Sequence, residues 1–311
     1  MLDSNKPQQN STLILGFPEY REQTQQLADY IGLPYSEVDL HRFPDGESRV
    51  RLPDKLPKKV IICRSLDNPN HKLVELALTA GTARELGVSE LILVAPYLCY
   101  MRQDKAFHAG EAISQRVIGK QLAQWFDAVV TVDPHLHRIQ ELSEVIPNIS
   151  TTTLTAARPI ADFLSESYDN PLLIGPDEES EQWVSAVAKM QGLEYVVGRK
   201  QRMDDYRVKI ILPESTGTAR NFILLDDIAS TGRTLESTAQ ALQAYKPASI
   251  SAVVTHALFM KDALERLKNA GITRIWSTNS IPHSTNVISL TKLIGATLKS
   301  QQQIQSSHSG F

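Results

Sequence analysis

Residues 221–234 read NFILLDDIASTGRT, and this stretch decides the fold class of the chain. Four apolar residues end in two acids, Asp226 and Asp227, and a turn of small residues then leads into a helical pattern at 234–245. An apolar run with these neighbours is typical of a buried strand in a parallel sheet that is followed by a helix. Acids at the carboxyl end of such a strand lie where open α/β sheets bind ligands.

The same strand–helix unit recurs on both sides of this stretch. Short β-branched runs alternate with longer amphipathic segments, which predicts an α/β fold with parallel sheets. The number of runs favours two sheets of similar size, each flanked by helices. The predicted strands are 11–17, 58–64, 90–96, 127–133, 170–177, 193–198, 208–212, 221–227, 250–257 and 274–280.

The length of the chain supports two domains, since 311 residues correspond to about two units of roughly 150 residues each. The sequence ISTTTLTAARP interrupts the alternation and predicts a boundary near residues 145–155. We therefore expect a first domain at 12–150 and a second at 151–300. The Gln- and Ser-rich ends, 1–11 and 301–311, are expected to be polar tails.

The composition excludes several classes of protein. The chain is 42% apolar and 22% charged, which is ordinary for a globular protein and excludes a disordered chain. A net charge of −3 gives no basic field for a nucleic acid or an anionic membrane, and no run approaches the length of a membrane span. The two cysteines, Cys63 and Cys99, cannot form a disulfide framework, so we expect a cytoplasmic protein.

The turn at 230–234 has the chemistry of a phosphate site. A Ser/Thr/Gly turn at the start of a helix offers backbone N–H groups, hydroxyls and the positive helix end. Asp226 and Asp227 can accept hydrogen bonds from a vicinal diol, so together the segment suits a sugar phosphate. The alternative is an ordinary capped strand–helix turn, which favours the same residue types. Neither a Walker A loop nor a GxGxxG loop is present in the sequence.

The DDxxSTGxT pattern resembles the loop that binds phosphoribosyl diphosphate in type I phosphoribosyltransferases and in ribose-phosphate diphosphokinases. Five more segments resemble the second family and follow its order along the chain. From about residue 13 to residue 297, the chain is therefore similar to the ribose-phosphate diphosphokinase family. The segments are RFPDGE (42–47), YMRQD (100–104), DPH (133–135), PD (176–177) and RKQR (199–202).

This resemblance implies two phosphoribosyltransferase-like domains and a role for each segment. ATP would be bound by Phe43, Asp45 and Glu47 across a subunit interface, and by Arg102, Gln103 and Asp104. The Mg²⁺ of Mg-ATP would lie near His135, a second ion could lie near Asp177, and Lys200 and Arg202 would be the catalytic cations. Ribose 5-phosphate would be bound by Asp226, Asp227, Ser230, Thr231, Gly232, Arg233 and Thr234.

The sequence departs from the family pattern at two loops. Glu179 and Ser180 stand where the family has two small residues, in the loop that would receive pyrophosphate. Arg233 stands where many members have a small residue, and it either contacts phosphate or points to solvent. The pair His135 and His137 is also compatible with zinc, but no cysteine or third histidine accompanies it, so we do not expect a zinc site.

The activity implied by the resemblance is transfer of the diphosphoryl group of Mg-ATP to ribose 5-phosphate, in a homo-oligomer such as a dimer or a hexamer. Two alternatives remain open. A phosphoribosyltransferase shares the ribose-phosphate loop, but it should lack the FPDGE and YMRQD segments. A catalytically silent regulatory paralogue would explain Glu179 and Ser180, whereas Lys200 and Arg202 argue against it.

Overall fold

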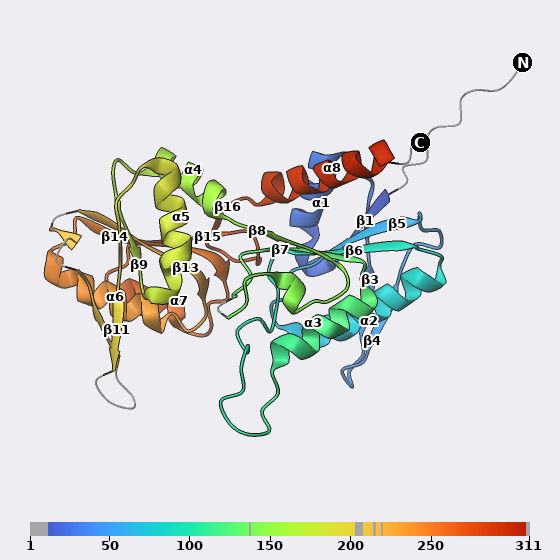
Figure 1. Ribbon diagram of the computed structural model, residues 1–311, viewed down its shortest axis with the longest axis horizontal. Coiled ribbons are helices and arrows are strands. Elements are labelled where there is room, and N and C mark those ends of the chain that lie inside the picture. The colour runs from blue at the N-terminus through green and yellow to red at the C-terminus, as the bar shows by residue number, and fades with distance from the viewer. Residues whose placement is uncertain (1–11, 137, 203–207, 214–215, 219, 309–311) are drawn as a thin grey trace, which may run out of the picture. The chain divides into compact units, whose positions relative to one another are not determined.

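The computed structural model describes residues 12–136, 138–202, 208–213, 216–218 and 220–308. The chain divides into two compact units, drawn in Figure 1. The first unit contains the chain up to Leu154 and the segment from Thr291 onward, and the second contains Thr155–Leu290. The division differs from the expected one at the C-terminal end, where the chain returns to the first unit.

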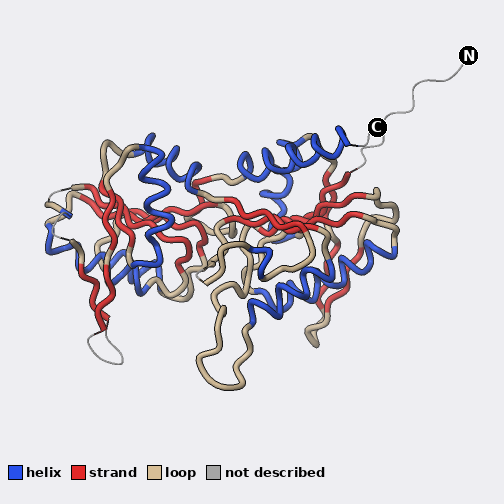
Figure 2. The backbone as a smooth tube through the Cα atoms, in the orientation of Figure 1, coloured by secondary structure: helices blue, strands red, loops and turns tan. Residues whose placement is uncertain are grey.

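The first unit is built on a six-stranded sheet whose strands are all parallel (Figure 2). Its strand order is β2-β1-β5-β6-β7-β8. The central strands are apolar and buried on both faces, as expected for a parallel sheet covered by helices. The strands are β1 (Thr12–Gly16), β2 (Tyr35–Glu37), β5 (Lys59–Cys63), β6 (Glu90–Ala95), β7 (Ala128–Val132) and β8 (Ser150–Leu154).

Helices cover both faces of this sheet, with α1 and α8 on one face and α2 and α3 on the other (Figure 1). Helix α8 contains much of the expected C-terminal tail and packs on α1. A methyl group at Gly295 would lie 2.3 Å from the ring of Tyr30, so this approach requires glycine. The helices are α1 (Arg21–Ile31), α2 (Pro69–Glu85), α3 (Ser114–Trp125) and α8 (Thr291–His308).

The second unit has another six-stranded parallel sheet, in the order β10-β9-β13-β14-β15-β16. Helices α4 and α5 pack together, as do α6 and α7. The strands are β9 (Leu172–Gly175), β10 (Tyr195–Val197), β13 (Asn221–Ala229), β14 (Ser249–Ala257), β15 (Arg274–Thr278) and β16 (Asn286–Ile288). The helices are α4 (Ala157–Ser167), α5 (Glu181–Gln191), α6 (Arg233–Leu242) and α7 (Ala263–Asn269).

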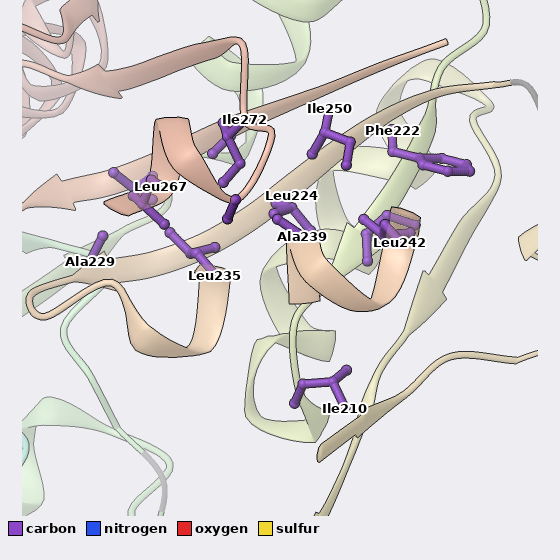
Figure 3. Close-up of a cluster of buried hydrophobic side chains, with 14 of the residues drawn as sticks. Ile210, Phe222, Leu224, Ala229, Leu235, Ala239, Leu242, Ile250, Leu267 and Ile272 are labelled. Atoms are coloured by element: carbon purple, nitrogen blue, oxygen red, sulfur yellow. The ribbon is translucent and has the colours of Figure 1, made fainter. Parts of the chain in front are cut away.

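A buried apolar cluster fixes α6 to the sheet of the second unit (Figure 3). Leu235, Ala239 and Leu242 recur at helical spacing, so they form one apolar stripe along α6. This stripe packs with Leu224 of β13 and Leu267 of α7 in the same cluster. The cluster thereby sets the position of the turn between β13 and α6.

The two units repeat one topology, which confirms the predicted fold class. In each sheet the second strand lies at the edge beside the first, and the later strands follow in order on the other side. Each unit also inserts a two-stranded antiparallel hairpin before its third sheet strand. These hairpins are β3–β4 (Asp39–Arg42 and Ser48–Arg51) and β11–β12 (Arg199–Arg202 and Val208–Ile211).

One predicted strand has a different place in the fold. Residues 208–212 were expected to form a buried parallel strand, and that prediction is wrong, because β12 pairs antiparallel with β11 outside the main sheet. The segment 150–154, expected to interrupt the pattern, forms the edge strand β8, which is rich in threonine and only partly buried. For β12, the apolar signal of a strand does not report its pairing partner, whereas β8 carries little apolar signal because it lies at the edge of the sheet.

Candidate active site

The corner between β13 and α6 holds the segment from which the fold was deduced. Strand β13 continues through Asp226 and Asp227 to Ala229, and α6 begins at Arg233. Between them, Gly232 has a left-handed φ of 72°, and a Cβ built on it would lie 3.4 Å from the side chain of Leu267. Glycine adopts this conformation without strain, and it lets the loop 230–234 turn sharply into the helix.

The hydroxyls of this loop have no hydrogen-bond partner among the described residues. Within the described part of the chain, the side chains of Ser230, Thr231 and Thr234 make no hydrogen bond, while Arg233 is exposed. The backbone of the loop is held instead, since the N–H of Met260 donates to the carbonyl of Ser230 at 3.0 Å. The free hydroxyls at the positive end of α6 are available to a phosphate.

Arg266 of α7 holds the loop 230–234 through hydrogen bonds of its guanidinium. Its guanidinium donates to the carbonyl oxygen of Thr231, to Glu236 of α6 at 3.2 Å and to Asp262 at 2.6 Å. One side chain therefore connects the loop 230–234, α6 and α7. The sequence reasoning missed Arg266, because its partners in the loop and in α6 lie 35 and 30 residues away along the chain.

Three carboxylates lie close together, one just after β9 and two near the carboxyl end of the neighbouring strand β13. Asp177 follows β9 and is buried, Asp227 is buried, and Asp226 is half-buried. Removal from water raises the pKa of Asp226 well above its usual range, and the nearby charges of Asp227 and Asp177 raise it further. The backbone N–H of Asp227 donates to the Asp226 carboxylate at 3.0 Å. The site thus brings together one predicted metal residue and both predicted ribose residues.

The loop after β9 is closed by its own side chains. Asp177 accepts hydrogen bonds from the N–H groups of Glu179 and Ser180, at 3.1 and 3.3 Å. The Ser180 hydroxyl accepts the backbone N–H of Asp177 and donates to its backbone carbonyl, so the two residues form a capping box. A Cβ on Gly175 would lie 2.6 Å from the Ser180 hydroxyl. Ser180 is therefore accommodated inside the loop, and Glu179 is on its outer side, where it is exposed.

The hairpin β11–β12 lies against this loop. Gly198, just before β11, donates its N–H to the carbonyl of Gly175 at 2.8 Å. A cleft of about 670 Å³ separates the hairpin from the start of α5, and its lining residues are Glu178, Glu181, Val197, Arg199, Ile211, Leu212 and Pro213. The backbone of Lys200 and Arg202 belongs to β11. Their side chains lie outside what the structure describes.

In the first unit, an ion pair joins two of the predicted ATP loops. Asp104 follows β6, and both oxygens of its carboxylate accept hydrogen bonds from Arg138, at 2.6 and 2.7 Å. Arg138 belongs to the loop after β7 that also carries His135. Gln103 donates to the carbonyl of Lys105 at 3.2 Å, and Arg102 is exposed.

Left-handed backbone conformations recur at these loops. Tyr100 has φ of 62° after β6, and Asp133 has φ of 37° after β7. Such conformations strain residues with a Cβ and are concentrated at functional sites. His135, two residues after Asp133, is half-buried, and His137 lies outside the described residues.

The tip of the hairpin β3–β4 presents the other predicted nucleotide residues. Phe43 is 42% exposed and packs edge-on against His41, with ring centroids 4.7 Å apart. The turn is closed by a backbone hydrogen bond from Phe43 to Glu47 at 2.8 Å. The carboxylate of Asp45 accepts the N–H of Glu47 at 3.1 Å, so the tip has a defined shape.

Among the described residues, no cluster of three or more His, Cys, Asp or Glu side chains has the geometry of a metal centre. The carboxylate of Asp177 suits Mg²⁺ rather than zinc, because Mg²⁺ prefers oxygen ligands and often takes only one or two from the protein. Substrate phosphates usually supply the others. Over the same described ranges, no helix is both long and apolar enough to cross a bilayer.

Comparison with known proteins assigns a family to both halves of the chain. Residues 12–125 match the family model of the N-terminal domain of ribose phosphate pyrophosphokinase, and residues 150–290 match that of the phosphoribosyl transferase domain. The ribose-phosphate pyrophosphokinase of Methanopyrus kandleri is 31% identical, covering 89% of this chain and 95% of the relative. That of Pyrococcus abyssi is also 31% identical and covers 83% of this chain and 88% of the relative.

A solved structure shares the fold. The phosphoribosylpyrophosphate synthetase from Mycobacterium smegmatis matches with a TM-score of 0.81 and covers 94% of this chain and 99% of its own. Its sequence is 19% identical, so this likeness concerns the fold alone. The two-unit architecture is therefore shared over nearly the whole length of both chains.

Proposed function

The chain belongs to the ribose-phosphate pyrophosphokinase family of enzymes, and we propose that it transfers the diphosphoryl group of Mg-ATP to ribose 5-phosphate. The products are 5-phosphoribosyl 1-diphosphate and AMP. The observation that carries the proposal is the β13–α6 corner, where buried Asp227 and half-buried Asp226 lie beside a loop whose hydroxyls make no hydrogen bond to any residue that the structure describes.

The sugar phosphate occupies this corner in the proposal. The 5-phosphate accepts hydrogen bonds from the loop 230–234 and lies at the positive end of α6. Asp226 and Asp227 accept hydrogen bonds from the ribose hydroxyls. Asp226 binds this neutral partner more easily than an anion, because its carboxyl already has a raised pKa beside two other acids.

ATP is bound by the loops of the first unit. Arg102 and Gln103 contact the nucleotide, and a guanidinium is well suited to phosphate oxygens. Asp104 contributes mainly by holding the loop, because Arg138 already engages its carboxylate. Phe43, Asp45 and Glu47 complete the nucleotide site of a neighbouring subunit, which implies a homo-oligomer such as a dimer or a hexamer.

In the transfer step, O1 of ribose 5-phosphate forms a bond to the β-phosphorus of ATP. The bond from that phosphorus to the oxygen bridging the α- and β-phosphates breaks, AMP leaves, and the O1 proton is released to water. His135 would hold the Mg²⁺ that accompanies ATP and Asp177 would hold a second ion, and such ions would supply neutralisation of phosphate charge. Lys200 and Arg202 stabilise the charge that develops on the transferring group. Positioning supplies most of the rate acceleration in such chemistry.

The proposal is tested by measuring AMP release from Mg-ATP by the purified full chain, with and without ribose 5-phosphate. We expect release that depends on ribose 5-phosphate and that Lys200→Ala reduces at least about 100-fold, as for loss of a transition-state contact. A chain that binds both substrates but releases no AMP would contradict the proposal and favour the silent paralogue. We place the enzyme in the cytoplasm, and fractionation of cells checks this placement.

A further inference from the structure

The position of the hairpin β3–β4, residues 39–51, depends on contacts outside its own two strands. It has only two strands and is not part of the six-stranded sheet. An isolated two-stranded hairpin is marginally stable in water. Its exposed tip nevertheless carries Phe43, Asp45 and Glu47, whose proposed contacts with a nucleotide require a fixed geometry.

A single carboxylate on α2 anchors the base of this tip. Arg42 and Ser48 are cross-strand partners on either side of the turn, and both donate to Glu75. Arg42 Nε lies 2.8 Å and the Ser48 hydroxyl 3.0 Å from the same carboxylate oxygen. The side chain of Glu75 is fully buried. A buried, charge-assisted contact of this kind restrains both strands at once.

A second buried charged side chain, that of Arg64, pairs with Glu75. Arg64, at the carboxyl end of β5, is fully buried and forms an ion pair with the other oxygen of Glu75. Its guanidinium also donates to Glu19 at 2.8 Å and to the carbonyl of Lys72 at 3.1 Å, and it lies 3.7 Å over the ring of Phe17. Arg64 is thus fixed from several sides by the first sheet and its loops.

The two arginines of this network compensate the buried negative charge of Glu75. Burial alone would raise the pKa of Glu75, but hydrogen bonds from Arg42 and Arg64 outweigh that effect and hold the pKa below its ordinary range. Glu75 is therefore a carboxylate at neutral pH, and it accepts hydrogen bonds from the hairpin on one side and from the sheet on the other.

We propose that Glu75, held by Arg64, is a positioning residue that fixes the hairpin 39–51 through Arg42 and Ser48 for nucleotide recognition. It touches no substrate itself. This inference rests on the proposed function for its nucleotide, but the anchoring of the hairpin is a property of the protein alone. Loss of this network should therefore weaken binding of the nucleotide. It should leave binding of the sugar phosphate unchanged, because the proposed sugar-phosphate site is on β13 and α6.

Removing Glu75 directly is a poor test, because it leaves Arg64 buried with less compensation and can prevent folding. The sharper variants act at the hairpin side of the network. Arg42→Ala and Arg42→Ala/Ser48→Ala release the hairpin while leaving the Arg64–Glu75 pair intact. Arg49→Ala is the matched control, since Arg49 is an exposed arginine of the same hairpin and pairs with Asp39 inside it.

Two measurements are made on each full-length variant. Hydrogen exchange of the peptide covering 39–51 reports the anchoring without any substrate. Steady-state AMP release reports KM for ATP, KM for ribose 5-phosphate and kcat. For Arg42→Ala we expect about tenfold faster exchange in this peptide and about tenfold higher KM for ATP, the size of one charge-assisted hydrogen bond. KM for ribose 5-phosphate and all values for Arg49→Ala should stay within about twofold.

The outcomes separate this inference from the proposed function. Unchanged exchange in Arg42→Ala/Ser48→Ala would overturn the anchoring role, and faster exchange with unchanged KM for ATP would overturn the role in recognition. A uniform loss in both KM values, together with faster exchange across the first unit, would show a merely structural role. If the wild type releases no AMP, the proposed function fails, while exchange still decides the anchoring. Partial recovery of KM for ATP in Arg42→Lys would support the role further, because lysine keeps the charge without the guanidinium fork.

Discussion

Arg138 donates from one guanidinium nitrogen to both carboxylate oxygens of Asp104, at 2.6 and 2.7 Å. The pair spans 34 residues of sequence and links the loops that follow β6 and β7. Asp104 is almost buried, whereas about half of the Arg138 side chain is exposed. The loop that carries Arg102 and Gln103 is therefore fixed to the loop that carries His135.

Loss of this pair should weaken ATP binding. We expect Arg138→Ala to raise KM for ATP about fivefold, corresponding to about 1 kcal/mol for a half-exposed ion pair. KM for ribose 5-phosphate should change little. Steady-state AMP release measures both values. Arg116→Ala, at an exposed position on α3, is the control, and an equal effect there would show that the pair has no special role.

The long central strands could be predicted from the sequence, but the short edge strands could not. The runs that became β1, β5, β6, β13 and β14 were found because each carries a continuous apolar signal. Short edge strands such as β2 and β16 have only three residues each, too few to form a recognisable apolar run. Their pairing comes from the neighbouring strand, so their own sequence does not reveal them.

The candidate site shows the same contrast. Asp226, Asp227 and the loop 230–234 could be recognised, because their spacing is local and forms one motif. Arg138, Arg266 and Glu75 could not, because each acts on residues 27–35 positions away along the chain. Such side chains are found only when the fold brings their partners together.

Removal of the Arg266 side chain, which holds the loop 230–234, should weaken binding of the sugar phosphate. Arg266→Ala deprives the Thr231 carbonyl and Glu236 of their shared donor. We expect KM for ribose 5-phosphate to rise about tenfold, since a charged donor is lost from a partly buried position. KM for ATP should stay within about twofold. Lys268→Ala, exposed on the same helix, is the control, and a similar rise there would argue against a specific role of Arg266.

The capping box after β9 allows two roles of Asp177 to be separated. Asp177→Ala removes the acceptor for two N–H groups and should lower the free energy of unfolding by about 1 kcal/mol. Asp177→Ser retains a capping oxygen, so most of this stability should return. If the carboxylate also holds Mg²⁺, both variants should lose AMP release to the same extent. Recovery of activity in Asp177→Ser would limit Asp177 to its capping role; urea unfolding and AMP release provide the two measurements.

The acids at the β13–α6 corner should make the stability of the protein depend on pH. Burial, and then the charges of Asp227 and Asp177, raise the pKa of Asp226 in the folded chain. A carboxyl with a raised pKa binds more protons when folded than when unfolded. Stability is therefore lost as the pH rises from about 4 through that raised pKa.

Asp226→Asn removes this titration and should reverse its effect. The variant should be more stable than the wild type at pH 8. The difference in stability should shrink as the pH approaches about 4, where the side chain at position 226 is uncharged in both folded proteins. Denaturant unfolding without ligands, measured at several pH values, tests this expectation. Glu166→Gln, at an exposed acid on α4, should show no such trend. A stability difference between Asp226→Asn and wild type that does not vary with pH would mean that Asp226 is already ionised in the folded chain across this range.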